Sequence, residues 1–406
     1  MSTLSRRTFL RNACSFAAGL GAQALTSRIP RTSAQGGPIY LPLILKSKGP
    51  IQVGPTRLYK TPSAAKAAAR DGDVIEIDPG LYTGDTIVWT QNNLTLRGVS
   101  GRAHLDLTGG TIPNQKAIWV IQGRDTTVEN IEFSGASVPD QNGAGIRQEG
   151  ANLTLRNCYF HHNQDGILTG ADASSEILIE FCEFAYNGHS GGYWHNLYIG
   201  GVKKFTLQFC YTHNAIDGHL VKSRALENHI LCNRIMDEVD GIASYEIDIP
   251  DGGATYIVGN LIQQSPVTHN SAIVTYAEES RNNPVQALYV VNNTIVNDRV
   301  NGVFINAPYS PPSSLVVNNL FIGSGTRIAG SLTAHHNRDG ALSDLINPAA
   351  YDYHLASGSP AINAGTNPGV MNGYDLAPAW EYVHPLSCIA RTTSGTTDIG
   401  AYEFHA

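Results

Sequence analysis

Several features that would point to common protein classes are scarce or absent in this sequence. Methionine is rare, with 3 residues, and charged residues make up only 15% of the chain. No stretch after the N-terminal segment approaches the ~20 consecutive apolar residues of a membrane helix, so we expect no membrane span. With a net charge of −7, the chain lacks the basic excess of a protein whose main partner is a nucleic acid.

Familiar catalytic motifs are also missing. The chain contains no HExxH, no CxxC pair, no P-loop and no GxSxG elbow, so zinc protease, nucleotide-binding and serine hydrolase functions lack support. Glycine (41 residues) and tyrosine (18 residues) are plentiful instead. Alternating Val, Ile, Leu, Thr and Tyr recur between Asn and Gly turns, a pattern that predicts an all-β protein.

The N-terminal segment resembles an export signal. SRRTFLRNACSFAAGLGAQA places Arg6 and Arg7 before a short apolar run that ends in small residues near Ala24. This is similar to a twin-arginine signal over residues 1–24, with an ordinary amphipathic N-terminus as the alternative. We expect a secreted, periplasmic or cell-surface protein, and the proline-rich segment 25–54 is interpreted as a linker.

Cysteines and asparagines form a periodic series. Loss of Cys14 with the signal leaves an odd number of cysteines, which is a poor disulfide framework. Seven similar stretches, such as TLRNCYF and VVNNTI, share an apolar residue followed by Cys or Asn three positions later. The successive positions lie 23–33 residues apart, a period that indicates the turns of a solenoid. They are Cys158, Cys182, Cys210, Asn233, Asn260, Asn293 and Asn319.

The period of two within each turn predicts strands, with the recurring residue at a corner between two of them. Stacked coils bring equivalent residues to ~4.8 Å, so buried Asn amides can hydrogen-bond along the axis. Buried amides require such partners. The three cysteines in the same series are then small core residues rather than metal or redox groups. Val99 and Ile131 extend the series backwards, and Cys232 lies one position off it.

With this ladder, the chain resembles the right-handed parallel β-helices of the pectate-lyase-like superfamily over residues 55–330. PSAAKAAARDGDVIEIDPGLYTGD resembles the N-terminal helical cap of such solenoids. Residues 331–406 are expected to form an irregular C-terminal cap. Within them, DYHLASGSPAINAG and DIGAYEF resemble a closing motif of secreted bacterial β-helix proteins with variable surface anchors. We expect a monomer.

A second alignment predicts which side chains face outward. It matches DGILTG (165–170), HNLYIG (195–200), DGHLVK (217–222) and DGIASY (240–245). Alternation along these strands sends one set of residues inward: Ile167, Leu197, His219 and Ile242, followed by Thr169, Ile199, Val221 and Ser244. The outward set is Leu168, Tyr198, Leu220 and Ala243, followed by Gly170, Gly200, Lys222 and Tyr245. A groove with Lys222 and Arg224 beside Tyr245 is therefore expected.

Other interpretations of these residues stay open. Asp165, Asp217 and Asp240 each precede Gly, as turn-capping residues do. Lys222 and Arg224 could be a solvated pair, and His219 a core residue. The acidic turn DEVDGIASYEIDIPDGG (237–253) could bind Ca²⁺, supply general acids or form ion pairs with the two cations.

The resemblance implies a polysaccharide lyase that cleaves a uronate-containing glycan by β-elimination. In that case Lys222 would be the base, with its pKa lowered by burial beside Arg224. Arg224 would bind the carboxylate, assisted by Ca²⁺, and His195 or Tyr245 would donate the proton. Tyr198, His219 and Gly200 would contact the substrate.

Two alternatives remain. A glycoside hydrolase would use two carboxylates of the acidic turn, such as Glu246 with Asp217 or Asp248. A non-catalytic glycan-binding or cell-surface β-helix would use the tyrosines and glycines as a stacking platform.

Overall fold

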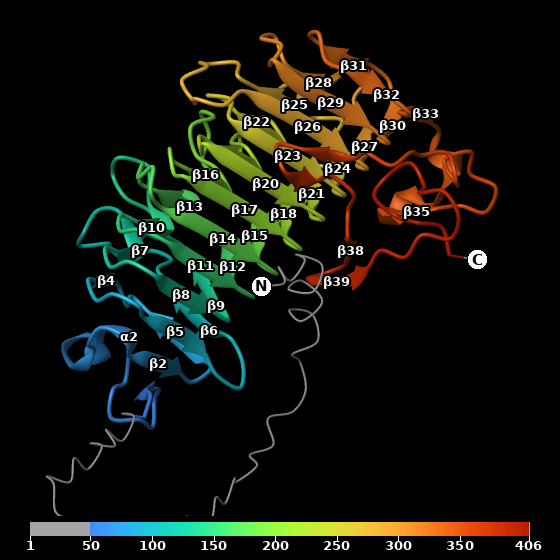
Figure 1. Cartoon of the computed structure of the whole chain (residues 1–406). Helices are drawn as coiled ribbons and strands as arrows, with labels where there is room; N and C mark the ends of the chain where they lie inside the picture. The colour runs from blue at the N-terminus through green and yellow to red at the C-terminus, as the bar shows by residue number, and fades with distance from the viewer. Residues whose placement is uncertain (1–48, 406) are drawn as a thin grey trace, which may run out of the picture. The chain divides into compact units, whose positions relative to one another are not determined.

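The computed structural model describes residues 49–405, so the expected export signal and most of the expected linker lie outside the described residues. The described chain winds through three parallel sheets, here named A, B and C, and each coil stacks on the one before it (Figure 1). One coil contributes one strand to A, then one to B and one to C. The expected all-β parallel solenoid is confirmed.

The strands of each sheet pair only with the equivalent strands of the neighbouring coils. Sheet A contains β1 (Ile51–Val53), β2 (Val74–Ile77), β5 (Thr95–Gly98), β8 (Thr126–Glu129), β11 (Leu153–Arg156), β14 (Glu176–Glu180), β17 (Lys204–Gln208), β20 (Glu227–Leu231), β23 (Ala254–Val258), β26 (Ala287–Val291), β29 (Ser313–Val317) and β32 (Ala334–His335). Sheet B contains β3 (Gly80–Thr83), β6 (Ala103–Asp106), β9 (Ile131–Ser134), β12 (Tyr159–His161), β15 (Glu183–Ala185), β18 (Tyr211–His213), β21 (Arg234–Met236), β24 (Leu261–Gln264), β27 (Thr294–Asn297), β30 (Leu320–Gly323) and β33 (Arg338–Gly340). Sheet C contains β4 (Ile87–Trp89), β7 (Ala117–Ile121), β10 (Ala144–Gln148), β13 (Asp165–Thr169), β16 (Leu197–Ile199), β19 (Val221–Ser223), β22 (Ile247–Ile249), β25 (Ala272–Tyr276), β28 (Val303–Asn306) and β31 (Thr326–Ala329).

The predicted ladder forms the corner between sheets A and B. A residue with positive φ, such as Asn157 (φ 51°), turns the chain, and the ladder residue after it points inward. Cys232 (φ 51°) occupies the turning position, which explains why it lies one position off the series. Because the corner has the same short length in each coil, the strands on both sides of it stay aligned with those of the neighbouring coils.

The asparagines of the ladder hydrogen-bond along the axis of the solenoid. Asn233 Oδ1 accepts the N–H of Cys210 at 2.9 Å, and Asn233 Nδ2 donates to Asn260 Oδ1 at 3.0 Å and to the carbonyl of Leu207 at 2.9 Å. The same pattern continues one coil beyond the predicted end, to Asn337. Each buried amide therefore has both donors and acceptor satisfied.

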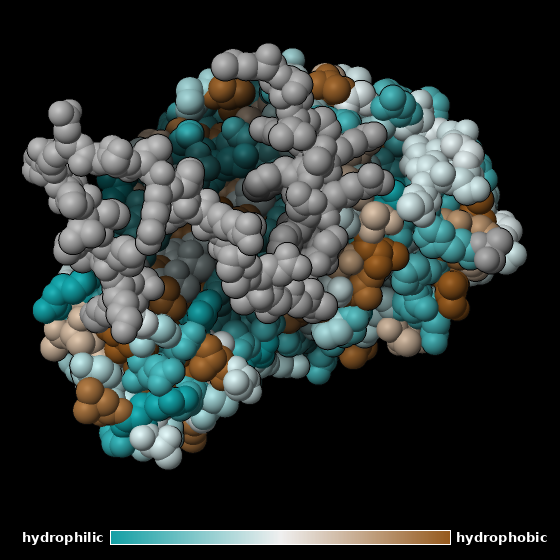
Figure 2. Space-filling view, turned by 60° about the horizontal axis from the view of Figure 1, so that its bottom comes forward, coloured by the Kyte–Doolittle hydropathy of each residue, from teal (hydrophilic) through white to brown (hydrophobic). Residues whose placement is uncertain are grey.

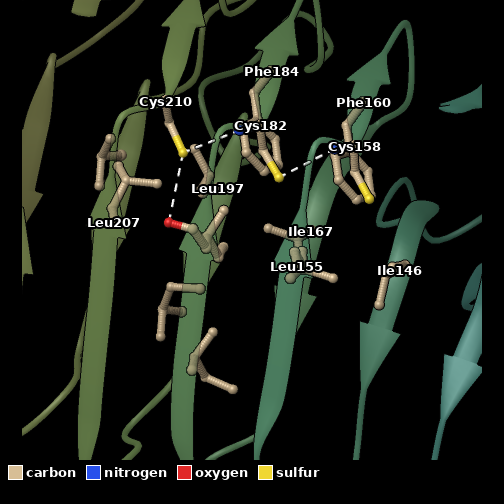
Figure 3. Close-up of a cluster of buried hydrophobic side chains, with 14 of the residues drawn as sticks. Ile146, Leu155, Cys158, Phe160, Ile167, Cys182, Phe184, Leu197, Leu207 and Cys210 are labelled. Carbon is tan, nitrogen blue, oxygen red and sulfur yellow. Dashed lines mark hydrogen bonds between the residues drawn. The ribbon is translucent and has the colours of Figure 1, made fainter. Parts of the chain in front are cut away.

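The three cysteines of the ladder are free and fully buried, as predicted (Figure 3). The N–H groups of Cys158 and Cys182 each point at the sulfur one coil further on, at 3.4 Å. Phe160 and Phe184 stack beside them with ring centres 4.8 Å apart. Identical neighbours in the core thus pack face to face, and the thiols act as small apolar side chains.

A second amide ladder, which the sequence patterns did not reveal, lies after the sheet B strands. Asn163 donates its N–H to Asn187 Oδ1 at 3.1 Å, and Asn187 donates its own to Asn196 Oδ1 at 3.2 Å. All three side chains are buried. This second ladder spans fewer coils than the first one, because the later coils have other residue types at the equivalent position.

A short helical cap covers the start of the solenoid, as expected. Thr61 caps α2 (Pro62–Ala65) by accepting the N–H of Ala64, and η1 (Lys66–Ala68) follows. Ala65 packs into the core below. Strand β1 precedes the cap and pairs with β2, so the last residues of the expected linker already belong to sheet A.

The C-terminal segment runs back along the outside of the later coils (Figure 1). It contains η2 (Leu342–Asp344), η3 (Pro348–Ala350) and three antiparallel hairpins: β34 (Leu345–Asn347) with β35 (Asp352–Leu355), β36 (Val370–Met371) with β37 (Tyr374–Asp375), and β38 (Trp380–Val383) with β39 (Ser387–Ala390). Its apolar side chains cover the outer faces of sheets A and B. The segment therefore closes the side of the solenoid, and strands of the solenoid continue past the expected end at residue 330.

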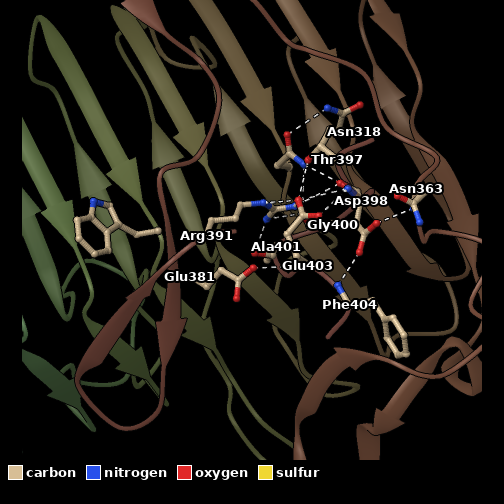
Figure 4. A network of polar contacts seen from close by, with 12 residues as sticks. Asn318, Asn363, Glu381, Arg391, Thr397, Asp398, Gly400, Ala401, Glu403 and Phe404 are labelled. Atoms are coloured by element: carbon tan, nitrogen blue, oxygen red, sulfur yellow. Dashed lines mark hydrogen bonds and ion pairs between the residues drawn. The ribbon is translucent and has the colours of Figure 1, made fainter. Parts of the chain in front are cut away.

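A buried polar network anchors the end of this segment (Figure 4). Arg391 Nε donates to Glu403 Oε1 at 2.7 Å, and both side chains are almost fully buried. Asp398 accepts the N–H groups of Asn363 and Phe404. Both acids belong to DIGAYEF, so this stretch has a definite structural role here.

Where residues 49–405 are visible in Figure 2, hydrophobic residues lie scattered among hydrophilic ones. No helix among residues 49–405 has the length and hydropathy needed to span a bilayer.

The amide ladder predicts a large local cost for its disruption. Asn260→Ala leaves buried donors and acceptors of three neighbouring residues, Asn233, Ile230 and Asn293, without their partner, so the free energy of unfolding should fall by about 3 kcal/mol. Denaturant unfolding measures this change. The exposed Asn282 is the matched control, and its replacement by Ala should change stability by at most about 0.5 kcal/mol. Equal effects at both positions would contradict the role of the ladder.

Candidate functional site

The outer face of sheet C carries a file of side chains that includes Lys222. The strand register places Leu168, Tyr198, Lys222, Asp248 and Thr275 side by side on five successive coils. Their neighbours along the strands point into the core. Lys222 therefore faces outward, as predicted.

The predicted neighbours of Lys222 are partly wrong. Leu220 and Ala243, expected outside, are fully buried in the core, and Ile242, expected inside, is partly exposed. Asp248, rather than Tyr245, stands one coil beyond Lys222. The turns before β19 and β22 are longer than the Asp-Gly alignment assumes, which shifts the register of both strands. Leu220 lies in the turn before β19, so the alternation of that strand does not extend to it.

Two carboxylates hold the Lys222 ammonium group. Nζ lies 2.9 Å from Asp248 Oδ2 and 3.2 Å from Glu279 Oε1, and the lysine side chain is only 10% exposed. Burial alone would lower the pKa of Lys222, but the two negative charges outweigh burial and raise it. The expected lowering of this pKa is therefore wrong, and the amine carries its proton at neutral pH.

Arg224 continues the cationic surface. Its guanidinium donates to Asp251 Oδ1 at 2.7 Å, to Glu279 Oε2 at 2.5 Å and to the Tyr198 hydroxyl at 2.9 Å. Both cationic groups lie 5.9 Å from the centre of the Tyr198 ring. Glu279 is half exposed, whereas Asp248 is almost fully buried. One carboxylate at the solvent side is thus shared by Lys222 and Arg224.

A stacked column borders this file at the start of the sheet C strands. The N–H of His195 donates to Asp165 Oδ1 at 2.8 Å, that of His219 to His195 Nδ1 at 3.0 Å, and that of Tyr245 to His219 Nδ1 at 3.2 Å. The ring centres are 4.6 Å apart for His195 and His219, and 4.9 Å apart for His219 and Tyr245. The alignment matched Asp165 with His195 correctly, but it put Asp217 and Asp240 where the structure has His219 and Tyr245.

Burial controls the protonation of this column. Loss of solvent lowers the pKa of His195 and His219 well below the ordinary value, so both rings are neutral. Because Nδ1 accepts a backbone N–H in each ring, the ring proton resides on Nε2. Burial raises the pKa of Tyr245 to about 12 and that of Asp165 to about 7.

A cleft of about 410 Å³ opens beside the column and the cationic file. Gly170 and Gly200 line it as predicted, and Asp165 and Tyr198 also contribute. Arg224, also predicted for this groove, lines the cleft, whereas Lys222, His195 and Tyr245 are not among its lining residues. The polar and aromatic walls that sequence patterns did not single out include Asn142, Arg147, Tyr193 and Trp194. Sequence patterns also missed Glu279, which lies in a loop after β25 with no recognisable motif.

Glu246 lies apart from this cleft. It precedes β22 and is fully buried, with Gln264 Nε2 of sheet B 3.5 Å from its Oε2. Burial, followed by the nearby charge of Asp237, raises its pKa well above the ordinary value. The predicted pairing of Glu246 with Asp248 in one outward site is therefore not seen, because Asp248 faces the Lys222 side.

Comparisons with known proteins agree with this architecture. Residues 87–262 match the family described as a right handed beta helix region. The fold of the described chain is a right-handed parallel β-helix. Among solved structures, pectate lyase Pel9A gives a TM-score of 0.59 at 16% identity, over 84% of this chain and 90% of that chain.

Two further structures are similar at lower scores. Pectin methylesterase PemA from Erwinia chrysanthemi has a TM-score of 0.41 at 14% identity, over 55% of this chain and 81% of its own. A rhamnogalacturonan lyase has a TM-score of 0.41 at 14% identity, over 74% and 91%. A search of curated protein sequences gave no match. At 16% identity the likeness to pectate lyase Pel9A establishes the fold alone.

Close approach of two coils at the cleft makes a specific prediction about Gly200. A Cβ atom there would lie 2.4 Å from the Gly170 carbonyl oxygen, so Gly200→Ala must push the coils apart. We expect a loss of about 1–3 kcal/mol in the free energy of unfolding. The adjacent Gly201→Ala is the control, since its Cβ would meet nothing closer than 3.8 Å. Similar stability of the two variants would contradict this geometry.

Proposed function

We propose that the protein is an extracellular carbohydrate-active β-helix enzyme that cleaves an acidic, uronate-containing glycan by β-elimination in the sheet C cleft. One observation carries the proposal. Lys222 and Arg224 together hold the half-exposed carboxylate of Glu279, which marks a position where a uronate carboxylate could bind in its place. The similarity of the fold to a pectate lyase supports the same substrate class.

In this mechanism Arg224 takes over the uronate carboxylate through its planar guanidinium, and Tyr198 orients that group. Neutralising the carboxylate makes the proton on the neighbouring ring carbon more acidic. Lys222, once deprotonated, removes that proton. Of the two predicted proton donors, Tyr245 protonates the leaving oxygen, since its hydroxyl carries a proton at neutral pH. His195 is the weaker acid, because burial keeps its ring neutral and only the N–H proton is left. His219 and Gly200 contact the sugar.

Ca²⁺ remains part of the proposal as an aid to carboxylate binding. The acidic turn by itself does not form an oxygen cage, because Asp237 and Glu246 are buried while Asp248 and Asp251 pair with the two cations. A Ca²⁺ ion would therefore need the substrate carboxylate together with exposed acids such as Glu279 as ligands.

A glycoside hydrolase is the second candidate, with a different pair of acids from the one predicted. Asp248 and Glu279 flank the same ammonium group, yet burial raises the pKa of Asp248, while Arg224 and Lys222 lower that of Glu279 despite its partial burial. A hydrolase needs one carboxyl group that stays protonated and acts as the acid, and a second that stays ionised and acts as the base or nucleophile. Two carboxyl groups whose pKa values are shifted in opposite directions meet this requirement. A non-catalytic glycan binder would use the same cleft without any proton transfer.

Lys222→Arg tests the base without removing the positive charge. Arginine keeps a cation beside Asp248 but cannot lose its proton, so turnover on a uronate glycan should fall by at least ~100-fold. Ultraviolet absorbance of the unsaturated product measures turnover over a panel of acidic and neutral glycans, with and without Ca²⁺. Alanine is less suitable, since it would leave the buried Asp248 unpaired and cost about 3–5 kcal/mol.

The exposed Lys203, paired with Glu176, is the matched control, and Lys203→Arg should keep full activity.

Because the pKa of Lys222 is raised, the neutral amine becomes more abundant as the pH rises, so lyase activity should increase from neutral to alkaline pH. A hydrolase that uses Asp248 as acid should instead lose activity in that range. Full activity of Lys222→Arg would remove Lys222 from the proposed mechanism.

Export through the twin-arginine route is proposed as the way to the extracellular site of action, with a monomer as the working form. Replacing both Arg6 and Arg7 by Lys should retain the protein inside the cell. Immunoblots of cell and culture fractions measure its distribution. Unchanged secretion of the double variant would contradict this route.

A further inference from the structure

The outer face of sheet B, separate from the cleft on sheet C, holds three potential metal ligands. The register aligns His104 with Glu132 on adjacent coils, while His161 follows one coil later in the neighbouring file. One ligand atom from each residue can be chosen so that all three lie within 4.8 Å of one another. The side chains are 16–27% exposed, so solvent reaches the group.

The distances are close to those of a tetrahedral metal site. His104 Nδ1 lies 3.4 Å from Glu132 Oε1, and His161 Nε2 lies 3.1 Å from the same oxygen. Ligand atoms bound to zinc at about 2.0–2.1 Å in a tetrahedron lie about 3.3 Å apart. Only a small movement of the three side chains would bring them to that spacing.

The remaining ring nitrogens have partners that would orient the two histidines. His104 Nε2 lies 2.7 Å from Ser134 Oγ, which donates to Asp106 Oδ1 at 3.2 Å. His161 Nδ1 lies 2.8 Å from His162 Nδ1. Metal-binding histidines usually have such a partner on the nitrogen that does not bind the metal, because it fixes the tautomer and the ring direction.

We propose that His104, Glu132 and His161 bind a divalent transition metal ion, with Zn²⁺ as the preferred ion and water in the fourth position. Two imidazoles and one carboxylate suit Zn²⁺, whereas Ca²⁺ and Mg²⁺ prefer oxygen ligands alone. The ion would join β6, β9 and β12, and thus three successive coils. Because the unfolded chain lacks this arrangement, the ion stabilises the folded form.

The solenoid repeats the same arrangement two coils further on with one ligand changed. Tyr159, Glu183 and His213 occupy the equivalent register positions, and His213 Nε2 lies 3.3 Å from Glu183 Oε1. Tyrosine takes the place of His104 there. This second group keeps the His–Glu pair but lacks a second imidazole, so it provides an internal control for the number and type of ligands.

The test uses the full chain, freed of metal by a chelator and dialysed, then titrated with ZnCl₂ by calorimetry near pH 7.5. We expect one tight site per chain and a rise in the thermal midpoint of unfolding. His104→Ala, Glu132→Gln and His161→Ala should each weaken binding at least ~10-fold. His213→Ala should leave both the affinity and the midpoint shift unchanged.

Co²⁺ provides a spectroscopic readout, since a tetrahedral Co²⁺ site gives visible absorption bands that should disappear in His104→Ala. Millimolar Ca²⁺ should not displace the bound ion. Circular dichroism of each variant without metal checks that the fold is retained, and His104→Gln is a second variant if alanine unfolds the coil. Absence of the tight site, or equal loss in His213→Ala, would overturn the proposal and leave an ion-paired cluster.

Discussion

Vertical alignment of equivalent residues is the constraint on which the rest of this structure depends. The ladder at the corner between sheets A and B sets it, because each inward side chain accepts the N–H of the equivalent residue one coil before. A shift of one residue in the strand register would leave the buried amides of this ladder without hydrogen-bond partners. Residues about one coil apart in sequence consequently become neighbours on all three faces, and both the cleft and the proposed metal site are built from such neighbours.

The same alignment has opposite consequences inside and outside the solenoid. In the core, identical neighbours are favourable, as the stacked Phe160 and Phe184 show. On the surface, identical charges on adjacent coils would repel one another, and the files instead alternate, with Lys222 next to Asp248 and His104 next to Glu132. The neighbour one coil away therefore decides the pKa of a surface group as much as its burial does. The two acids beside Lys222 outweigh its burial and raise the pKa of its amine, whereas burial is the largest effect on His195 and His219 and lowers the pKa of both rings.

The fold could be predicted from the sequence because the A–B corner always has the same length. Aligning the stretches around its Cys and Asn residues therefore brings equivalent positions together. That alignment correctly places all ladder residues from Cys158 to Asn319 in one column of stacked side chains. The turns before sheet C vary in length, so a local motif such as Asp-Gly does not mark equivalent positions there. Tyr198 kept the predicted direction because β16 was aligned correctly, and Lys222 kept it because the error in β19 was two residues, an even number. Glu279 could not be found, since nothing in its own loop indicates that it reaches across to Arg224.

The two acids around Lys222 differ in a way that defines what the site can exchange. Asp248 is buried, receives the hydroxyl of Thr275 at 2.8 Å and lies 3.4 Å from His219 Nε2, so it is fixed by the solenoid. Glu279 is half exposed, and the ion pairs of its carboxylate within residues 49–405 are with Lys222 and Arg224. An incoming carboxylate can replace Glu279 at little cost in desolvation, because one charged partner simply takes the place of another. Displacing Asp248 from Lys222 would instead leave its buried carboxylate without a positively charged partner. The lysine thus has one buried acid and one solvent-facing acid, and in the proposed mechanism the solvent-facing one is exchanged for a carboxylate of the acidic polymer.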